Sequence, residues 1–296
     1  MTLLPFDDRP GTIWLDGRLV PWRDARLHVL SHGLHYASCV FEGERVYDGT
    51  VFRLAEHSER LVESARIMGM TLPLSAVEIA AATRELVAAN GLGDGYVRPI
   101  AWRGSEAMGV SAPAARPRVA IAAWPWPAYF SPEARRRGIR MTMAGYARPA
   151  PHTAPTRSKA AGLYMIGTLC KEAAERDGFD DALMLDWRGC VAEATGANVF
   201  LVIDGVLHTP TPEGFLDGIT RRAVMALARA RGLAVVERTI QPAELAQASE
   251  LFLTGSAAEI TPVGELDGRR FAVGPVSLQL IEDFADLTRG RRQVAA

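Results

Sequence analysis

The clearest candidate for chemistry in this sequence is Lys159, in the run Ser-Lys-Ala-Ala-Gly-Leu-Tyr at residues 158–164. The chain has 33 lysines and arginines, yet only Lys159 and Lys171 are lysines. Burying an ammonium group without a partner is costly, so a lysine among small residues indicates a need for its primary amine. Amines form Schiff bases and guanidinium groups do not. A solvent-exposed loop lysine is the alternative, and these neighbours alone leave both open.

A carboxylate, Glu193, lies in a second segment of small residues, Val-Ala-Glu-Ala-Thr-Gly-Ala-Asn at 191–198, between two expected strands. A carboxylate in such surroundings either meets a cation or has a raised pKa. The protonated nitrogen of a pyridine ring is one such cation. A structural salt bridge is the competing interpretation.

Two turns of small residues could bind an anion. The first, Gly-Ile-Thr at 218–220, lies where a loop enters a helix, and N–H groups at such a helix start favour a phosphate. A simple threonine cap is the alternative. The second, Thr-Gly-Ser-Ala-Ala-Glu at 254–259, follows an apolar strand and could bring amides and a hydroxyl to an anion. Many strands end in such turns, so neither is specific by itself.

Polar pairs in the first half suggest two further kinds of site. Tyr96 and Arg98 share one face of an expected strand, where they could jointly bind a carboxylate. A packing pair with a salt bridge is the alternative. His32 and His35 could bind a metal, but no third ligand stands at a suitable spacing, so no metal is expected.

Composition limits the class of protein and its partners. At 296 residues, 48% of them apolar and 23% charged, the chain is typical of globular proteins with one large or two medium domains. A formal charge of −1 gives no reason to expect nucleic acid as a partner. The three cysteines, Cys39, Cys170 and Cys190, show no paired spacing, so neither disulfides nor zinc are expected. Without a leader or a long apolar run, we expect a cytoplasmic protein with no membrane partner.

The elements that must position these residues alternate along the chain. Thr12 to Trp22 resembles a hairpin with Asp16-Gly17 as its turn, and the Trp-Pro-Trp-Pro segment at 124–127 interrupts regular structure. Apolar spacing and capping signals predict helices near 54–69, 75–91, 162–177, 220–231 and 275–288. Strands are expected near 96–103, 119–124, 139–146, 233–239 and 250–253, with two or three more in 182–207. This mixture, in two unequal halves, predicts two α/β or α+β domains.

Taken together, these segments resemble the fold-type IV pyridoxal-phosphate aminotransferases, most closely the branched-chain amino-acid aminotransferases. The resemblance is carried by Ser-His-Gly-Leu-His-Tyr-Ala-Ser-Cys-Val-Phe-Glu-Gly at 31–43, Tyr-Val-Arg-Pro at 96–99, Met-Gly-Val at 108–110, the lysine run at 158–164, Glu-Ala-Thr-Gly-Ala-Asn at 193–198, Leu-Asp-Gly-Ile-Thr-Arg at 216–221 and Gly-Ser-Ala-Ala-Glu-Ile-Thr-Pro-Val at 255–263. It extends from about residue 12 to residue 288 in the right order, which argues against chance.

The resemblance implies pyridoxal 5'-phosphate as the cofactor, bound as a Schiff base by Lys159, which also moves the substrate's proton. It implies that Tyr164 hydrogen-bonds the cofactor's phenolic oxygen and that Glu193 keeps the pyridine nitrogen protonated. Arg60, inside the helix expected at 54–69, matches the family's phosphate-binding arginine. The remaining implied cofactor-binding residues are Gly196, Leu216, Gly218, Ile219, Thr220, Ser256 and Ala257.

Substrate binding follows the same resemblance. It implies that Tyr96 and the amides around Ala257 and Ala258 bind the α-carboxylate, and that Arg98 binds the distal carboxylate of glutamate. The implied apolar side-chain pocket, partly supplied by a second subunit, consists of Tyr36, Phe41, Met108, Val110 and Tyr129.

The resulting expectation is the two-domain architecture of fold-type IV enzymes, in a homodimer, with the active site at the domain junction. A small N-terminal α/β domain covers residues 1–126, a linker 127–135, and a larger C-terminal domain with a β-barrel-like mixed sheet 136–296. The expected activity exchanges the α-amino group of L-leucine, L-isoleucine or L-valine with 2-oxoglutarate by a ping-pong cycle. A D-amino-acid or (R)-amine transaminase and an aminodeoxychorismate lyase are alternatives on the same scaffold. A ligand-binding protein without turnover is a further one, against which Lys159, Glu193 and Arg60 argue.

Three residues depart from the family pattern, and the mildest departure is Ser256, which replaces the more usual threonine and keeps the hydroxyl. Glu44 occupies a position where an apolar residue is expected, and Arg103 is likewise more polar than expected. We expect the two to form an ion pair, because a paired buried charge is tolerated where an unpaired one is not. If they instead face the pocket, they alter the preference for the amino acceptor.

Overall fold

The computed structural model describes residues 5–126 and 132–294, which form two compact units. Of these residues, the first unit comprises 5–126 together with 158–162, and the second comprises 132–157 and 163–294. The segment with Lys159 therefore belongs to the first unit, although its neighbours on both sides in the sequence belong to the second. The predicted linker at 127–135 lies partly outside the described residues, and the predicted domain limits stay predictions.

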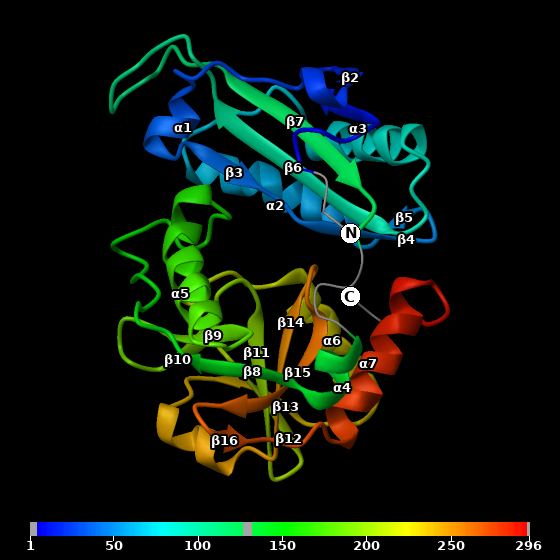
Figure 1. The fold of residues 1–296 in the computed structure, drawn as a ribbon, viewed down its shortest axis with the longest axis vertical. Helices are drawn as coiled ribbons and strands as arrows, with labels where there is room; N and C mark the ends of the chain where they lie inside the picture. The colour runs from blue at the N-terminus through cyan, green and yellow to red at the C-terminus, as the bar shows by residue number, and fades with distance from the viewer. Residues whose placement is uncertain (1–4, 127–131, 295–296) are drawn as a thin grey trace. The chain divides into compact units, whose positions relative to one another are not determined.

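The first unit is built on an antiparallel sheet with helices packed against it (Figure 1). Its strands lie in the order β2-β1-β7-β6-β4-β5, and β3 also pairs with β6. Helices α2 and α3 pack against each other and against strands of this sheet. The elements are β1 (Thr12–Leu15), β2 (Arg18–Pro21), α1 (His32–Tyr36), β3 (Cys39–Phe41), β4 (Glu44–Tyr47), β5 (Thr50–Val51), α2 (Leu54–Ile67), α3 (Ala76–Ala89), β6 (Gly95–Arg103) and β7 (Pro117–Trp124).

The register between β3–β4 and β6 sorts the functional candidates onto two faces. Phe41 pairs with Ile100 and Glu44 pairs with Val97, so the register continues unbroken through residues 42 and 43. Because side chains alternate along a strand, Glu42 and Glu44 lie on one face, and Phe41 and Gly43 lie on the other. Helix α2 covers the face of Glu42, as the contacts below show.

The second unit contains a closed barrel. Its strands pair in the order β10-β9-β8-β15-β14-β11, and an additional pairing of β10 with β11 closes the ring. The strands are β8 (Ile139–Met143), β9 (Asp181–Leu185), β10 (Val191–Ala194), β11 (Asn198–Ile203), β14 (Glu250–Gly255) and β15 (Glu259–Leu266). Closure removes sheet edges, and fully buried aliphatic side chains such as Met141, Leu183, Leu201 and Leu253 form its core.

Outside the ring, β12 (Val206–Pro210), β13 (Val235–Arg238) and β16 (Arg269–Arg270) extend the sheet. The helices are α4 (Pro132–Arg137), α5 (Met165–Arg176), α6 (Ile219–Ala230) and α7 (Pro275–Thr288), with α6 and α7 in contact (Figure 1). Buried Glu250 caps α7, because its carboxylate accepts hydrogen bonds from the N–H groups of Val276 and Ser277. Within the described parts of the chain, we find no helix of the length and apolar character that a membrane span requires.

Candidate active site

Lys159 is fixed through its backbone between strand β3 and helix α2. Its N–H donates to Ser64 Oγ at 3.0 Å, and its carbonyl accepts from the N–H of Phe41 at 3.2 Å. Its amine lies 5.0 Å from the centroid of the Phe41 ring. Lys171 differs: its amine donates to the Asp180 carbonyl and lies 3.5 Å from Asp181 Oδ2, a structural role within the second unit.

The face of Phe41 also carries the predicted carboxylate-binding pair. The Arg98 guanidinium lies 4.7 Å from the Phe41 ring centroid, and its Nη2 donates to Tyr96 Oη at 3.2 Å. The Tyr96 ring in turn packs against Trp126, at 5.4 Å between centroids. The structure therefore brings together Lys159, Phe41, Tyr96 and Arg98, four of the residues that the sequence singled out.

Gly43 makes this arrangement possible. A Cβ at residue 43 would overlap the Tyr96 hydroxyl. We expect Gly43→Ala to displace that hydroxyl and to raise KM for the amino donor by about 10- to 100-fold, the value of one hydrogen bond to a charged group. Gly93→Ala is the matched control, because a Cβ there meets open space. The measurement is steady-state kinetics, together with a melting temperature that shows that the variant is as stable as the wild type. An unchanged KM would show that Tyr96 does not bind substrate.

On the opposite face, under α2, three side chains form a buried cluster that the sequence analysis did not find. Glu42 Oε1 and Oε2 accept hydrogen bonds from Arg60 Nε at 2.7 Å and Nη2 at 2.9 Å. His57 Nδ1 lies 2.7 Å from Glu42 Oε2. Burial alone would raise the pKa of Glu42, but the charge and hydrogen bonds of Arg60 and the hydrogen bond of His57 hold it well below its usual range. Burial lowers the pKa of His57, which is therefore neutral.

Glu44 lies on the same face, completely buried, and neither carboxyl oxygen has a hydrogen-bond partner among the described residues. Burial, reinforced by the charge of Glu42, raises the pKa of Glu44 well above its usual value. The expected ion pair with Arg103 is wrong: Arg103 Nη2 donates to the carbonyls of Met68 and Gly69, at 3.3 and 2.8 Å. These carbonyls end helix α2, where a cation is favourable.

In the second unit, Glu193 stands at the closing seam of the barrel, paired with Asn198 across β10 and β11. Asn198 Nδ2 donates to Glu193 Oε2 at 3.3 Å, and Arg148 Nε lies 3.2 Å from Glu193 Oε1. Arg148 is buried, and its Nη1 also donates to the Leu163 carbonyl at 3.3 Å, immediately before Tyr164. Arg148 and Asn198 were not selected from the sequence, although Asn198 lies within the motif that contains Glu193.

Asn198 connects Glu193 to the start of α6. Its Nδ2 also donates to the carbonyl of Leu216 at 3.0 Å, and its Oδ1 occupies the space that a Cβ on Gly218 would need. Gly218 is the N-cap residue of α6 and supplies no side-chain cap to the N–H groups that follow it, those of Ile219 and Thr220 among them. The predicted anion site at 218–220 and the predicted carboxylate are thus held by one side chain.

The turn predicted at 254–259 contains the connection between β14 and β15, whose last pair is Gly255 with Glu259. Ser256, Ala257 and Ala258 form this three-residue loop, and Glu259 takes a φ of 52°. Thr254, just before it, pairs with Asn198 across the strands, and its fully buried Oγ1 has no hydrogen-bond partner among the described residues. The turn, Asn198 and α6 therefore belong to one neighbourhood of the second unit.

The other predicted residues lie as follows. Tyr164 immediately precedes α5, and Gly196 lies in the turn between β10 and β11. Tyr36 stacks on His32 at 4.6 Å between ring centroids, while Met108 and Val110 are exposed. Tyr129 lies outside the described residues.

His32 and His35 are engaged as hydrogen-bonding residues. His32 Nδ1 contacts Ser38 Oγ and its Nε2 contacts the Gly109 carbonyl, both at 2.8 Å; His35 Nε2 contacts the Val29 carbonyl. Over residues 5–126 and 132–294, no group of three or more His, Cys, Asp or Glu side chains could hold a metal ion.

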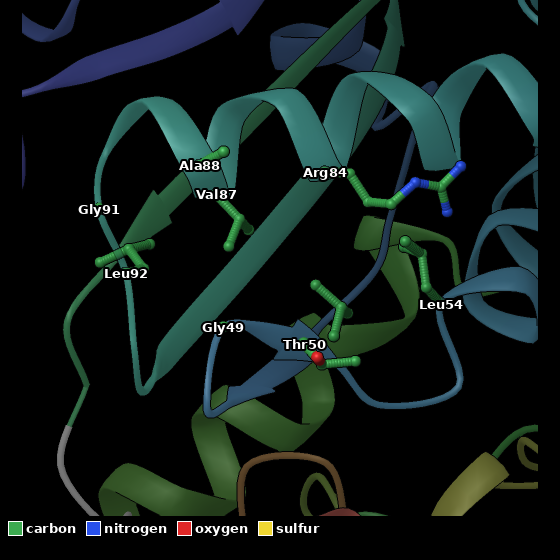
Figure 2. A pocket seen from close by; sticks show the side chains of 9 residues that line it. Gly49, Thr50, Leu54, Arg84, Val87, Ala88, Gly91 and Leu92 are labelled. Atoms are coloured by element: carbon green, nitrogen blue, oxygen red, sulfur yellow. The ribbon is translucent and has the colours of Figure 1, made fainter.

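A pocket of about 410 Å³ lies elsewhere in the first unit, between the β4–β5 hairpin, the start of α2 and the C-terminal half of α3 (Figure 2). Val51, Leu54, Val87 and Leu92 supply its apolar walls, and within the described part of the chain Arg84 is the one charged residue that lines it. None of the predicted site residues that the structure describes lines this pocket.

Comparison with known proteins identifies the class. Residues 39–266 match the family model of the class IV aminotransferases, and the chain belongs to this family. The chain is 44% identical to the branched-chain-amino-acid aminotransferase of Pseudomonas aeruginosa, over 98% of this chain and 96% of that protein.

Two solved structures extend the similarity. The branched-chain amino acid aminotransferase of Escherichia coli gives a TM-score of 0.93 at 40% identity, covering 96% of this chain and 97% of that one. The branched-chain amino acid aminotransferase of Thermobaculum terrenum, in its PLP-form, gives 0.88 at 33% identity, covering 96% of this chain and 95% of that one. These similarities confirm the predicted family and its two-part α/β and β-barrel fold class.

Proposed function

We propose that this protein is a pyridoxal 5'-phosphate-dependent transaminase that exchanges the α-amino group of branched-chain L-amino acids with 2-oxoglutarate. The observation that carries the proposal is the backbone-fixed Lys159, whose amine lies over Phe41 on the sheet face of Tyr96 and Arg98. The family membership and the names of the relatives, branched-chain aminotransferases over nearly the whole chain, support the activity and the substrate class.

The residues of the second unit fit the cofactor's polar groups. The Glu193 carboxylate suits a protonated pyridine nitrogen, and the N-terminal amides of α6 with the orphaned hydroxyl of Thr254 suit a phosphate. When bound, pyridoxal phosphate supplies an aldehyde and a ring that accepts electrons from the substrate's Cα.

Each candidate residue then has a task. Lys159 would hold the cofactor through its Nζ, and its free amine would move the proton of the substrate's Cα. Tyr164 donates to the phenolic oxygen. Gly196 shapes the turn beside Glu193, and Leu216 anchors Asn198 through its carbonyl. Arg60, Gly218, Ile219, Thr220, Ser256 and Ala257 bind the phosphate.

Two groups of residues bind the substrate in this proposal. Tyr96 and the amides of Ala257 and Ala258 hold the α-carboxylate, while Arg98 takes the distal carboxylate of glutamate. Phe41 and Tyr129 line the side-chain pocket. A cation beside an apolar ring lets one pocket accept both leucine and glutamate.

The protein is proposed to be a homodimer, with Tyr36, Met108 and Val110 reaching the partner's pocket. Large apolar side chains that are exposed in two segments of the first unit support this assignment, since a subunit interface would cover them. They are Leu27, Val29, Leu30, Leu34, Tyr36, Met108 and Val110. His32, which stacks on Tyr36, contacts the Gly109 carbonyl and so connects the two segments. The cytoplasmic location and the absence of nucleic-acid and membrane partners stay predictions.

A half-reaction screen tests the substrate class. The holoenzyme is mixed separately with L-leucine, D-alanine and (R)-1-phenylethylamine, and the absorbance of the bound cofactor is followed. We expect rapid conversion by L-leucine alone. Conversion by D-alanine or by the amine without L-leucine would assign the protein to another substrate class on the same scaffold.

A further inference from the structure

The guanidinium of Arg60 is held along one edge. Glu42 accepts hydrogen bonds from Nε and Nη2, at 2.7 and 2.9 Å, which is the bidentate geometry that fixes both the position and the plane of a guanidinium. The Glu42 side chain is completely buried, whereas Arg60 keeps 17% of its side-chain surface exposed. Part of the Arg60 side chain is therefore exposed, while the carboxylate that fixes its position is buried.

Glu42 is itself fixed from two sides. Its backbone N–H donates to the Pro99 carbonyl at 2.8 Å, which holds it in register with β6. His57, one turn before Arg60 on α2, lies with Nδ1 2.7 Å from Glu42 Oε2. The carboxylate accepts, so a neutral His57 donates from Nδ1. The hydrogen bonds thus run from His57 to Glu42 and from Arg60 to Glu42, within one sheet–helix layer.

We propose that Glu42 and His57 are positioning residues that hold Arg60 ready for the phosphate monoester of the cofactor, so that they contribute to phosphate recognition specifically. This inference rests on the proposed function, because it takes Arg60 as a phosphate ligand. An arginine loses much rotamer freedom when it binds an anion. A bidentate carboxylate that orders it beforehand removes that cost from the binding step.

The experiment compares two ligands that differ only in the phosphate. The full chain, stripped of cofactor, is titrated with pyridoxal 5'-phosphate and separately with pyridoxal, and binding is followed by tryptophan fluorescence. In Glu42→Gln we expect the affinity for pyridoxal phosphate to fall about tenfold, as for a weakened charge-assisted contact, with the affinity for pyridoxal unchanged. Glu44→Gln is the matched control: the same change, two residues further along on the same face, at a side chain without a hydrogen bond to Arg60. It should leave both affinities unchanged.

Several outcomes would overturn the inference. An equal fall for both ligands in Glu42→Gln would show a merely structural role, and no fall would show no role. If Glu42→Gln gives no folded protein, the variant Arg60→Lys tests the proposal instead, because a lysine keeps the charge but cannot form the bidentate pair of hydrogen bonds to Glu42. Full affinity of Arg60→Lys for pyridoxal phosphate would contradict the proposal. If Arg60→Ala leaves the ratio of the two affinities unchanged, the phosphate assignment of Arg60 itself fails, which separates that failure from a failure of Glu42 alone.

Discussion

Lys159→Ala is expected to abolish transamination and covalent attachment of the cofactor together. In the proposed function, Lys159 supplies both the attachment of the cofactor and the proton transfer, and a positioned acid–base group alone contributes about 10²–10⁴-fold to a rate. The activity should therefore fall by at least about 10⁴-fold. Borohydride reduction of the wild-type holoenzyme, followed by peptide mass spectrometry, should find the cofactor's mass on the peptide that contains Lys159.

The sequence offers a matched control, because Lys171 is the only other lysine. Lys171→Ala removes an amine that binds the Asp180 carbonyl and Asp181, so it should keep both the activity and the labelled peptide. Lys159→Arg keeps the charge and should be as inactive as Lys159→Ala, since a guanidinium does not replace the amine. Partial recovery of Lys159→Ala with a small added amine would support the proton-transfer role. Cofactor attachment that survives in Lys159→Ala would refute the assignment.

Glu44→Leu is expected to stabilise the protein, in contrast to most substitutions of buried residues. The Glu44 carboxyl is fully buried without a hydrogen-bond partner among the described residues. Such a group costs about 1–3 kcal/mol, and a leucine, which has no polar atom to satisfy, removes this cost. The thermal midpoint should rise by roughly 2–4 °C per kcal/mol. A lower midpoint would show that the carboxyl is satisfied in a way that these contacts do not reveal.

The stabilisation should depend on pH in a defined direction. In the unfolded chain Glu44 ionises near its ordinary pKa of 4.5, whereas in the folded protein it stays protonated because burial and Glu42 raise its pKa. The folded state therefore holds the extra proton between these two pKa values, and the stability of the wild type falls as pH rises through that window. The advantage of Glu44→Leu should grow with pH above about 4.5. Glu44→Gln, which keeps a buried polar group but cannot ionise, should show this pH-dependent part alone.

Residues that act by their own chemical type could be predicted from the sequence. Lys159 and Glu193 stand out because an amine and a carboxylate among small residues need a partner, and Gly218 because a helix start exposes N–H groups. Glu42, His57 and Arg148 could not be found this way. Their contribution depends on which side chain lies next to them in space, and strand register and helix packing decide that.

The limits of the fold prediction have the same cause. Where the apolar period is clear, the predicted ends of a helix agree with the structure within a few residues. The helix predicted at 54–69 is Leu54–Ile67, and the helix predicted at 75–91 is Ala76–Ala89. Strand β15 was not predicted. It contains Pro262, and its register with β8 shifts between Val263 and Glu265, which disturbs the alternating pattern. The ring of the barrel needs this strand between β8 and β14, so the closed barrel could not be derived from the pattern alone.

The membership of residues 158–162 in the first unit has a consequence for biosynthesis. More than 110 residues separate the hydrogen-bonding partners Phe41 and Lys159, a non-local contact of the kind that forms late in folding. During synthesis from the N-terminus, the sheet of the first unit can assemble once β7 has emerged. Lys159, whose carbonyl accepts a hydrogen bond from Phe41 of β3, emerges only after β8. Until then, the edge of β3 and the Ser64 hydroxyl lack their Lys159 partners. The nascent chain therefore passes through a stage in which the sheet of the first unit has formed and the backbone of Lys159 is not yet bound to Phe41 and Ser64.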